Sequence, residues 1–427
     1  RTAGDACDRD VEAAIDAAAT QGLAAAERLL LAVRTTCPSS SRPLTELAGV
    51  RFSQQRYRES AVFAQQATTL DRRDTHAWDL LATSRFLQDD VLGALAAWNT
   101  IGRPRLDAVH IDGLARTRYA LAAAWLSLTP DALLSAGDFA RAERRLTLLP
   151  VASQSSLRLV PLPEESGGDG SFVEVQASVL EQRPGPGSAA EWLAAGLRAG
   201  VSREVDAVLP GWTGQGEAWS GGWRWWPHRP GVTLSFAAPF TGHLGGVWRV
   251  DAAWRAETFA SRDDAGSAVT PLRQEMQHAG LSRSDWITGN LRYALDASVD
   301  RWNTTGHGAI GITLEQRAAR DRLSARLTAR EWWPLSRRVA ERSVSRLALD
   351  GEARSSAVET GTVWLARAGV AAASAGAPLI VWPTAGDITA DSPLLRRPDL
   401  LLVELQLRVP LHRFVNKRLD RSRPTRL

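Results

Sequence analysis

The sequence predicts a multidomain chain with three parts: an all-α repeat region over residues 1–104, a small α+β domain over 105–184, and an antiparallel transmembrane β-barrel over 185–427. A 34-residue repeat marks the first part, and helical and strand periodicities alternate in the second. Period-two alternation with a high Trp content marks the third. With 44% hydrophobic and 23% charged residues, the chain has the composition of a folded protein.

A shift of about 34 residues aligns the apolar positions of the first part with one another. Leu47 then matches Leu81, and Ala48 matches Ala82. Small residues at such positions let paired helices approach closely, and bulky residues fill the gap between them. Residues 7–104 therefore resemble three tetratricopeptide repeats, which implies a concave protein-binding face. An ordinary antiparallel helix bundle is the alternative.

Cys7 and Cys37 are the two cysteines of the chain, and they stand at the two ends of the first predicted helical hairpin. In an antiparallel pair, the start of the first helix lies near the end of the second, so the two thiols can meet. We therefore expect a disulfide and an oxidising compartment. Two unrelated structural cysteines are the alternative.

In the second part, the apolar periodicity predicts five elements in the order strand, helix, helix, strand, strand. They span residues 109–114, 116–128, 136–149, 156–161 and 172–181. This order resembles a POTRA domain, as do the "FARAERRLTLLP" helix and the closing "VEVQASVLEQRP" strand. The resemblance implies that an edge strand pairs with an extended client, and the edge candidates are Val109, Ile111, Leu157 and Leu159. A generic α+β linker domain is the alternative.

In the third part, apolar and polar residues alternate in repeated segments, and we expect no helix between them. The residues expected to face lipid are Trp248, Val250, Trp254, Leu291, Tyr293 and Leu295. Those expected to face the lumen are Arg249, Asp251, Arg255, Arg292 and Asp296. Trp residues at predicted strand ends indicate an aromatic girdle: Trp219, Trp223, Trp302, Trp332 and Trp333. A soluble sheet with one wet face is the alternative.

Tetratricopeptide, POTRA-like and barrel segments in this order resemble the BamA/TamA-like outer-membrane assembly and secretion superfamily. The resemblance implies a functional arginine in a loop that folds back into the lumen, and Arg396 is the lumen-loop candidate. Arg397 and Pro398 stand where that motif has Gly and an aromatic residue, so a solvated loop arginine is the alternative. The basic tail over 411–427 and the expected count of about 12 strands also depart from the family. We therefore expect either a truncated barrel or closure by other strands.

The resemblance implies an outer-membrane protein with its N-terminal domains in the periplasm, which translocates or assembles client proteins. Its partners would be clients in extended form, other envelope proteins on the repeats, and membrane lipid. Alternatives are an exopolysaccharide export porin with a tetratricopeptide scaffold, or a structural envelope scaffold. Because the single Met, Met276, is internal, we expect that Arg1 is not a translation start.

No enzymatic activity, cofactor or metal is expected, because the sequence has no HExxH, GxSxG or phosphate-loop motif. Nucleic acid is not an expected partner either. The net charge is only +4, and Lys417 is the sole lysine, so the bias toward Arg reflects base composition rather than nucleic-acid binding.

Overall fold

The structure is a computed structural model, and it describes residues 3–162, 172–259, 271–336, 342–355, 363–374, 376–385, 395–396 and 399–408. The chain divides into two compact units. The first comprises Arg1–Gly113, Leu126–Glu143 and Ser155–Val179, and the second comprises Leu114–Trp125, Arg144–Gln154 and Leu180–Leu427. The division runs through the segment predicted as the domain 105–184.

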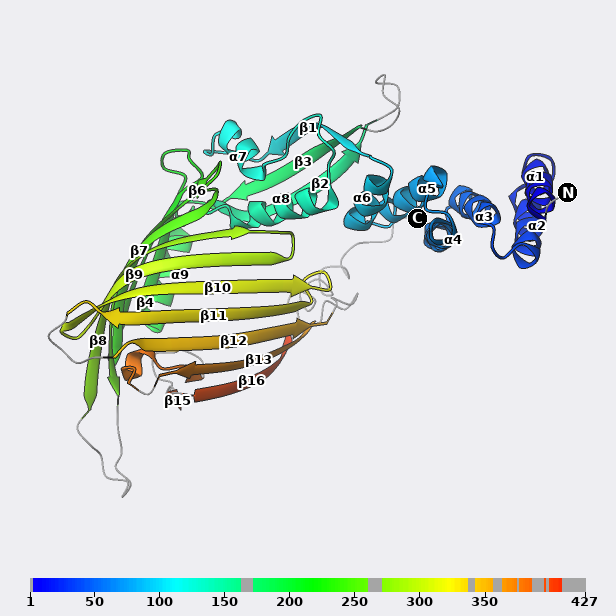
Figure 1. The fold of residues 1–427 in the computed structure, drawn as a ribbon. Coiled ribbons are helices and arrows are strands. Elements are labelled where there is room, and N and C mark those ends of the chain that lie inside the picture. The colour runs from blue at the N-terminus through cyan, green and yellow to red at the C-terminus, as the bar shows by residue number, and fades with distance from the viewer. Residues whose placement is uncertain are drawn as a thin grey trace, which may run out of the picture. The chain divides into compact units, whose positions relative to one another are not determined.

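Six helices form the repeat region: α1 Ala3–Gln21, α2 Leu23–Thr36, α3 Arg42–Ser53, α4 Tyr57–Leu70, α5 Thr75–Phe86 and α6 Val91–Thr100 (Figure 1). The positions that the 34-residue shift aligns lie in its core, because Leu47, Ala48, Leu81 and Ala82 are all 0% exposed. Asp74 caps α5 by accepting a hydrogen bond from the Ala77 N–H. The predicted all-α repeat region is confirmed.

A three-stranded sheet follows, with β1 Arg105–Asp112, β2 Ala152–Pro161 and β3 Phe172–Glu181 in the order β1-β3-β2. Helices α7 Tyr119–Leu126 and α8 Ala136–Leu148 come between β1 and β2 in the chain, so the element order is the predicted one. β1 runs parallel to β3. The two strands named as edge candidates, β1 and β2, are therefore the edges of this sheet.

The third part forms an antiparallel sheet in which each strand pairs with its neighbours in the chain (Figure 1). Its strands are β4 Glu204–Pro210, β5 Ala218–Trp226, β6 Arg229–Phe240, β7 Gly246–Phe259, β8 Leu272–Trp286, β9 Leu291–Trp302, β10 Thr305–Ala318, β11 Leu323–Pro334, β12 Val344–Arg354, β13 Val363–Ala373 and β16 Asp399–Arg408. Within the described ranges the sheet has 11 strands and ends at β4 and β16, with no pairing between these two edges. The predicted antiparallel sheet is confirmed.

The expectation that no helix interrupts the third part was wrong. Helix α9, Ala189–Ser202, precedes β4, and a short 3-10 helix, η2, spans Leu379–Val381. Ser188 and Glu191 start α9 with a capping box: the Ser188 hydroxyl accepts the Glu191 N–H, and the Glu191 carboxylate accepts the Gly187 N–H. Of the helices that the structure describes, none combines the length and the hydrophobicity needed to cross a membrane.

Candidate functional site

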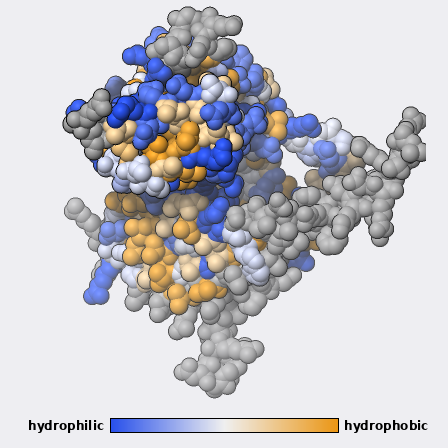
Figure 2. Space-filling model, turned by 90° about the vertical axis from the view of Figure 1, so that its right-hand side faces the viewer, coloured by the Kyte–Doolittle hydropathy of each residue, from blue (hydrophilic) through white to orange (hydrophobic). Residues whose placement is uncertain are grey.

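The large sheet has one apolar face that is open to the surroundings. The strand register places its large apolar residues opposite one another, as with Leu295 and Ile312, or Leu349 and Val370. These side chains are 40–51% exposed, and Val299, Leu401 and Val403 on the same face are 55–74% exposed. Figure 2 shows hydrophobic residues gathered in patches, with hydrophilic residues between them, on the face that it presents. A soluble monomer rarely exposes such a surface without a binding partner for it.

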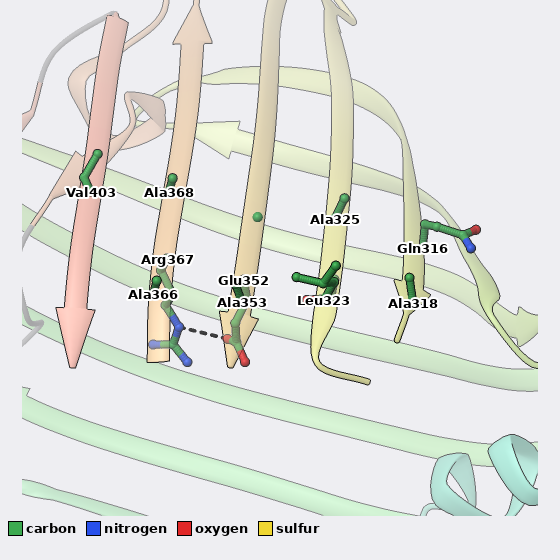
Figure 3. Close-up of a pocket in the computed structure, with 12 residues that line it drawn as sticks. Gln316, Ala318, Leu323, Ala325, Glu352, Ala353, Ala366, Arg367, Ala368 and Val403 are labelled. Atoms are coloured by element: carbon green, nitrogen blue, oxygen red, sulfur yellow. Dashed lines mark hydrogen bonds and ion pairs between the residues drawn. The ribbon is translucent and has the colours of Figure 1, made fainter. Parts of the chain in front are cut away.

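A shallow depression of about 450 Å³ lies in this apolar face, across β10–β13 and β16. Five of its twelve lining residues are alanines: Ala318, Ala325, Ala353, Ala366 and Ala368 (Figure 3). Arg367 and Glu352, whose ion pair measures 2.9 Å, alternate with these alanines along their strands. Charged groups near the depression are thus directed to the opposite face by the period-two alternation.

The opposite face is concave and polar. Glu204 on β4 and Arg330 on β11 line the same cavity of about 440 Å³, although their strands are far apart in the sheet order. Only the inside of a curled sheet can bring such strands together. A second cavity of about 440 Å³ is lined by Ser220, Ser282 and Arg292, and also by Pro150 after α8. The concave face therefore encloses polar space suited to hydrophilic material.

Asp300 is the centre of the best-connected polar cluster on the concave face. Its side chain is 0% exposed. It accepts hydrogen bonds from His278 Nδ1, Trp332 Nε1 and the Ser298 hydroxyl. His278 Nε2 lies 2.7 Å from the Asp251 carboxylate. Each of these side chains is hydrogen-bonded to another side chain of the cluster. We therefore interpret the cluster as a structural hydrogen-bond network. In the described part of the chain, no group of His, Cys, Asp and Glu has the arrangement of a metal site.

Helix η2 packs onto the concave face at one end of the sheet. Ile380 and Val381 are each 2% exposed and belong to a cluster with Met276, Trp302, Ala309, Trp332 and Val344. The Ile380 N–H donates to Gln274 Oε1 at 3.0 Å, and Arg255 donates to the Ile380 carbonyl at 3.4 Å. Residues 377–382 thus pack against the strand ends and cover the concave face there.

Two of the predicted girdle residues belong to this cluster instead. Trp302 and Trp332 are 7% and 4% exposed on the concave side, whereas Trp219, Trp223 and Trp333 are 40–57% exposed on the apolar side. The girdle assignment of Trp302 and Trp332 was wrong. Position at a strand end alone did not separate the two groups, since the parity of the residue along the strand decides which face it joins.

At the opposite end of the sheet, α8 is bound to two of the sheet's turns. Arg144 donates to Asp321 at 2.7 Å and to the Gly289 carbonyl at 3.0 Å, and Arg145 pairs with Asp285 at 2.7 Å. The pKa of Asp321 lies below its ordinary value: burial raises it, but the hydrogen bond and charge of Arg144 lower it by more. These ion pairs fix the last turn of α8 to the large sheet.

The loop between β4 and β5 lies at the same end. Arg116 donates to the Pro210 carbonyl at 2.8 Å, and the Arg118 N–H donates to the Gly214 carbonyl. Glu217, 1% exposed, organises this loop by accepting the N–H groups of Thr213 and Gln215. Burial raises the pKa of Glu217, but these backbone hydrogen bonds outweigh burial and leave the pKa below its ordinary value.

The edge candidates of the small sheet keep their backbones at an edge but turn their side chains inward. Ile111, Leu157 and Leu159 are only 6–8% exposed, and Val109 is half-buried. The Leu162 N–H donates to the Phe172 carbonyl of β3. In an uninterrupted antiparallel strand, the N–H of Leu159 then points away from β3. The groups that this edge exposes are therefore backbone groups and the side chain of Arg158.

The beginning of β1 is already covered. The Leu106 N–H donates to the Ala132 carbonyl, and the Leu106 carbonyl accepts the Asp131 N–H. The start of β1 is therefore not an open edge. β2 is accordingly the better edge of the two.

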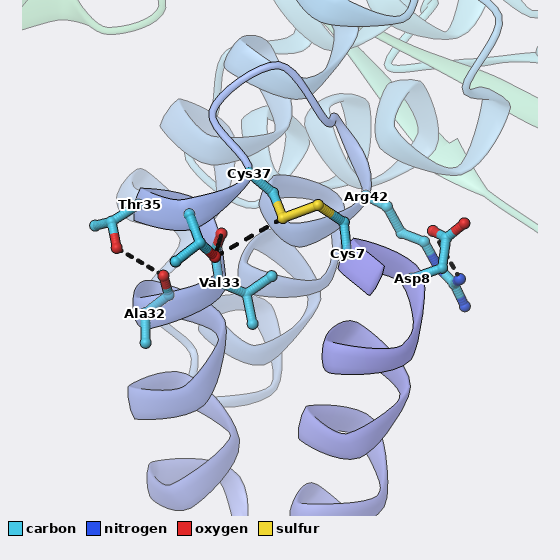
Figure 4. Close-up of a disulfide and its surroundings, with 8 residues drawn as sticks. Cys7, Asp8, Ala32, Val33, Thr35, Cys37 and Arg42 are labelled. Carbon is cyan, nitrogen blue, oxygen red and sulfur yellow. Dashed lines mark hydrogen bonds and ion pairs between the residues drawn. A yellow bond between two sulfur atoms is a disulfide. The ribbon is translucent and has the colours of Figure 1, made fainter. Parts of the chain in front are cut away.

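Cys7 and Cys37 form a disulfide between α1 and α2 (Figure 4). Cys37 is 7% exposed and packs in a core cluster with Val11, Leu30 and Leu47. Next to the disulfide, Arg42 at the start of α3 pairs with Asp8 and Glu12 of α1. The first hairpin and the following helix are thus held by one covalent bond and two ion pairs.

Arg396, the lumen-loop candidate, lies in β15, Leu395–Arg396, which pairs with β14, Thr384–Ala385. Its side chain is not among those that the structure describes. Among the described residues between β13 and β16, Ala377, Ile380, Val381 and Trp382 belong to the apolar cluster on the concave face. The apolar run from Leu379 to Trp382 could have indicated this from the sequence. The basic tail 411–427 lies outside the described residues.

No protein-family model matches the chain, and no curated protein matches it. Among solved structures, it is similar to BamA from Haemophilus ducreyi lacking POTRA domains 1–3, at 12% identity and a TM-score of 0.37. That match covers 67% of this chain and 59% of the BamA chain. The chain is also similar to the Sgt2 TPR domain from Aspergillus fumigatus, at 23% identity and a TM-score of 0.21, over 22% of this chain and 62% of that domain. A third similar structure is the type III secretion translocator chaperone SycD from Yersinia enterocolitica, at 12% identity and a TM-score of 0.22, over 22% and 73% of the two chains.

Proposed function

We propose that this chain is an outer-membrane protein that translocates or assembles client proteins. The helical repeats and the POTRA-like unit stand in the periplasm and capture an extended client, and the barrel exports or inserts it. The proposal assigns no chemical reaction to the chain. In this proposal, an edge strand of the chain pairs with the extended client, and the barrel then exports or inserts that client.

The two-faced sheet is the observation that carries the membrane part of the proposal. Large apolar side chains are exposed on the outer face across the whole sheet, while Asp300 and Glu315 on the concave face are 0% and 4% exposed. This is the reverse of a soluble protein, in which charges face water and apolar groups are buried. A membrane barrel has this arrangement, with lipid outside and a polar lumen inside.

The open edge of β2 supports the client part of the proposal. An edge strand offers unpaired N–H and C=O groups to an extended peptide, and main-chain pairing tolerates many client sequences. Pro161, at the end of β2, has no N–H, which is a common way to limit such an edge. The stretch before it, with Leu157 and Leu159, is long enough for several pairing bonds.

A pair of variants at Leu159 tests this mechanism. Leu159→Pro removes the side chain and the outward N–H, whereas Leu159→Ala removes most of the side chain but keeps the N–H. We expect Leu159→Pro to reduce client cross-linking through a photoreactive residue at Arg158, and Leu159→Ala to preserve it. Both variants must insert into membranes to the same extent as the parent chain, which gel heat-modifiability measures.

Two outcomes contradict the proposal. If both Leu159 variants cross-link clients like the parent while deletion of residues 1–104 abolishes capture, the repeats are the receptor and the small sheet is a spacer. If the chain isolated from cells carries polysaccharide and no extended protein client, it is an export porin for glycans.

A further inference from the structure

Residues 182–203 carry the chain from one end of β4 to the other. Glu181, the last residue of β3, accepts the N–H groups of Arg116 and Thr117 at 3.0 and 2.9 Å. Arg116 in turn donates to the carbonyl of Pro210, where β4 ends. Since β4 begins at Glu204, the chain must travel the length of β4 before entering it. Helix α9 makes up most of this path, and it contacts β4.

Helix α9 is apolar on all but a narrow side. At about 100° per residue, Trp192, Leu193, Leu197 and Val201 fall on one half of the helix. These four side chains are 63–86% exposed, and no residue of α9 is buried. Glu191 is occupied at the N-terminus, where its carboxylate accepts the Gly187 N–H. Arg198 is then the sole charged residue in the remaining turns of the helix.

The end of α9 is fixed to the sheet. Trp226 Nε1 donates to the Ser202 carbonyl at 2.8 Å, and the Trp225 N–H donates to the Arg203 carbonyl at 3.0 Å. A helix of 14 residues rises about 21 Å, which is close to the roughly 25 Å height of the apolar band of a membrane barrel. Its apolar half therefore matches the depth over which the strands expose apolar residues.

We infer that α9 is embedded in the bilayer beside the edge strand β4, with Trp192, Leu193, Leu197 and Val201 against lipid acyl chains. The inference rests on the proposed membrane location of the sheet. On β4 itself, Val205 and Leu209 of the apolar face are 43% and 46% exposed, so the surface of α9 continues that of the strand. A helix satisfies its backbone groups internally, which makes it a suitable neighbour for a sheet edge in hydrocarbon.

A position in the lumen would put the same side chains against charges. The concave face next to β4 presents Asp206, Arg224 and Arg255 to the enclosed cavity. Burying Leu197 or Val201 against such groups would strip them of water without giving a hydrogen-bond partner. The composition of α9 therefore favours lipid over the lumen.

Site-directed spin labelling tests the inference on the full chain in phospholipid vesicles. Both native cysteines are in a disulfide, so an added cysteine is the single free thiol. We expect a label at Leu197→Cys to be relaxed more by oxygen, which partitions into lipid, than by a water-soluble nickel complex. A label at Arg198→Cys, on the polar side of the same turn, should show the reverse ratio.

Two further labels separate this inference from the proposed function. Ile310→Cys lies on the apolar face of β10, and Thr313→Cys lies on its concave face. If Ile310 reports lipid and Thr313 reports water, but Leu197 reports water, then α9 is in the lumen or in solution and the inference is overturned while the membrane sheet stands. If Ile310 also reports water, the membrane location of the sheet itself fails.

Discussion

At the scale of single residues, the two adjacent arginines of α8 bind one end of the large sheet: Arg144 contacts two of its turns and Arg145 the end of β8. Arg144 bonds with Asp321 and the Gly289 carbonyl, and Arg145 bonds with Asp285. Arg144 also lies over the Trp286 ring at 5.2 Å. A single substitution in this cluster should therefore weaken the contact of α8 with the sheet, because each charged group has several partners.

Replacing Asp321 by Asn should loosen the end of α8 from the turn over residues 319–322. Its side chain is 24% exposed, so we expect a loss of about 1–3 kcal/mol in the local stability of this contact. Because the folded pKa is depressed, the contribution is present above the unfolded pKa of about 4 and is lost as the pH falls through the folded pKa. Hydrogen exchange of the backbone amides of residues 144–148 measures this local stability as a function of pH.

The parent chain should thus lose protection at residues 144–148 on acidification, whereas Asp321→Asn should lack it already at neutral pH. Asp107→Asn, at an exposed position of β1, is the matched control and should exchange like the parent. Equal protection of the parent at neutral and strongly acidic pH would show that the ion pair does not hold α8.

The disulfide between Cys7 and Cys37 should contribute about 2–4 kcal/mol to the stability of the α1–α2 hairpin, because it closes a long loop. Alkylation without reductant should label no thiol, and alkylation after reduction should label two. Hydrogen exchange of α1 and α2 should increase on reduction, while that of α5 and α6 stays constant as an internal reference. Two free thiols in the native protein would contradict this prediction.

The sequence allowed the face of many residues to be predicted, but not their partners. Alternation along β9 placed Arg292 and Asp296 on one face and Leu295 on the other, as the register has them. It could not show that Asp300 would meet His278, because strand register depends on loops and on neighbouring strands. Trp302 and Trp332 were placed in the girdle from their position at strand ends, although the parity of these residues along their strands turns them inward.

At the scale of elements, helices α9 and η2 were not predicted, whereas the long periodic segments were. The 34-residue repeat and the strands β7, β9 and β16 were found from periodicity, which accumulates over many residues. Helix α9 was missed, although Ser188 and Glu191 carry a capping-box signal, because Gly196 and Gly200 lower the intrinsic helix preference of an otherwise Ala-rich segment. The three residues of η2 are too few for any periodicity to appear.

A matched pair of neighbours on β10 tests which face meets lipid. Ile312, 40% exposed, stands opposite Leu295 and Ala329, and Thr313 stands opposite Ala294 and Thr328. We expect Ile312→Arg to cost about 2–4 kcal/mol in urea unfolding from vesicles, because it places a charge in hydrocarbon. Thr313→Arg should cost much less, since it points into the polar interior. A larger loss for Thr313→Arg would mean that the faces are reversed.

At the scale of the whole sheet, its two ends are chemically distinct. One end bears the turns that Arg144, Arg145 and Arg116 hold, and therefore belongs with the proposed periplasmic side. The other end bears the β9–β10 turn and the cluster that η2 covers. In an antiparallel sheet, successive turns alternate between the two ends. Assigning one turn to the periplasmic side therefore assigns the side of every other turn.

The assignment predicts which positions can be reached from outside the cell. Thr304, in the β9–β10 turn, and Asn290, in the β8–β9 turn, are both exposed but lie at opposite ends of β9. A membrane-impermeant maleimide applied to intact cells should label Thr304→Cys and leave Asn290→Cys unlabelled. Both should be labelled after the outer membrane is permeabilised, which controls for thiol reactivity. Labelling of Asn290→Cys alone in intact cells would mean that the sheet has the opposite orientation, with the end that Arg144 contacts outside the cell, and would contradict the proposed periplasmic side.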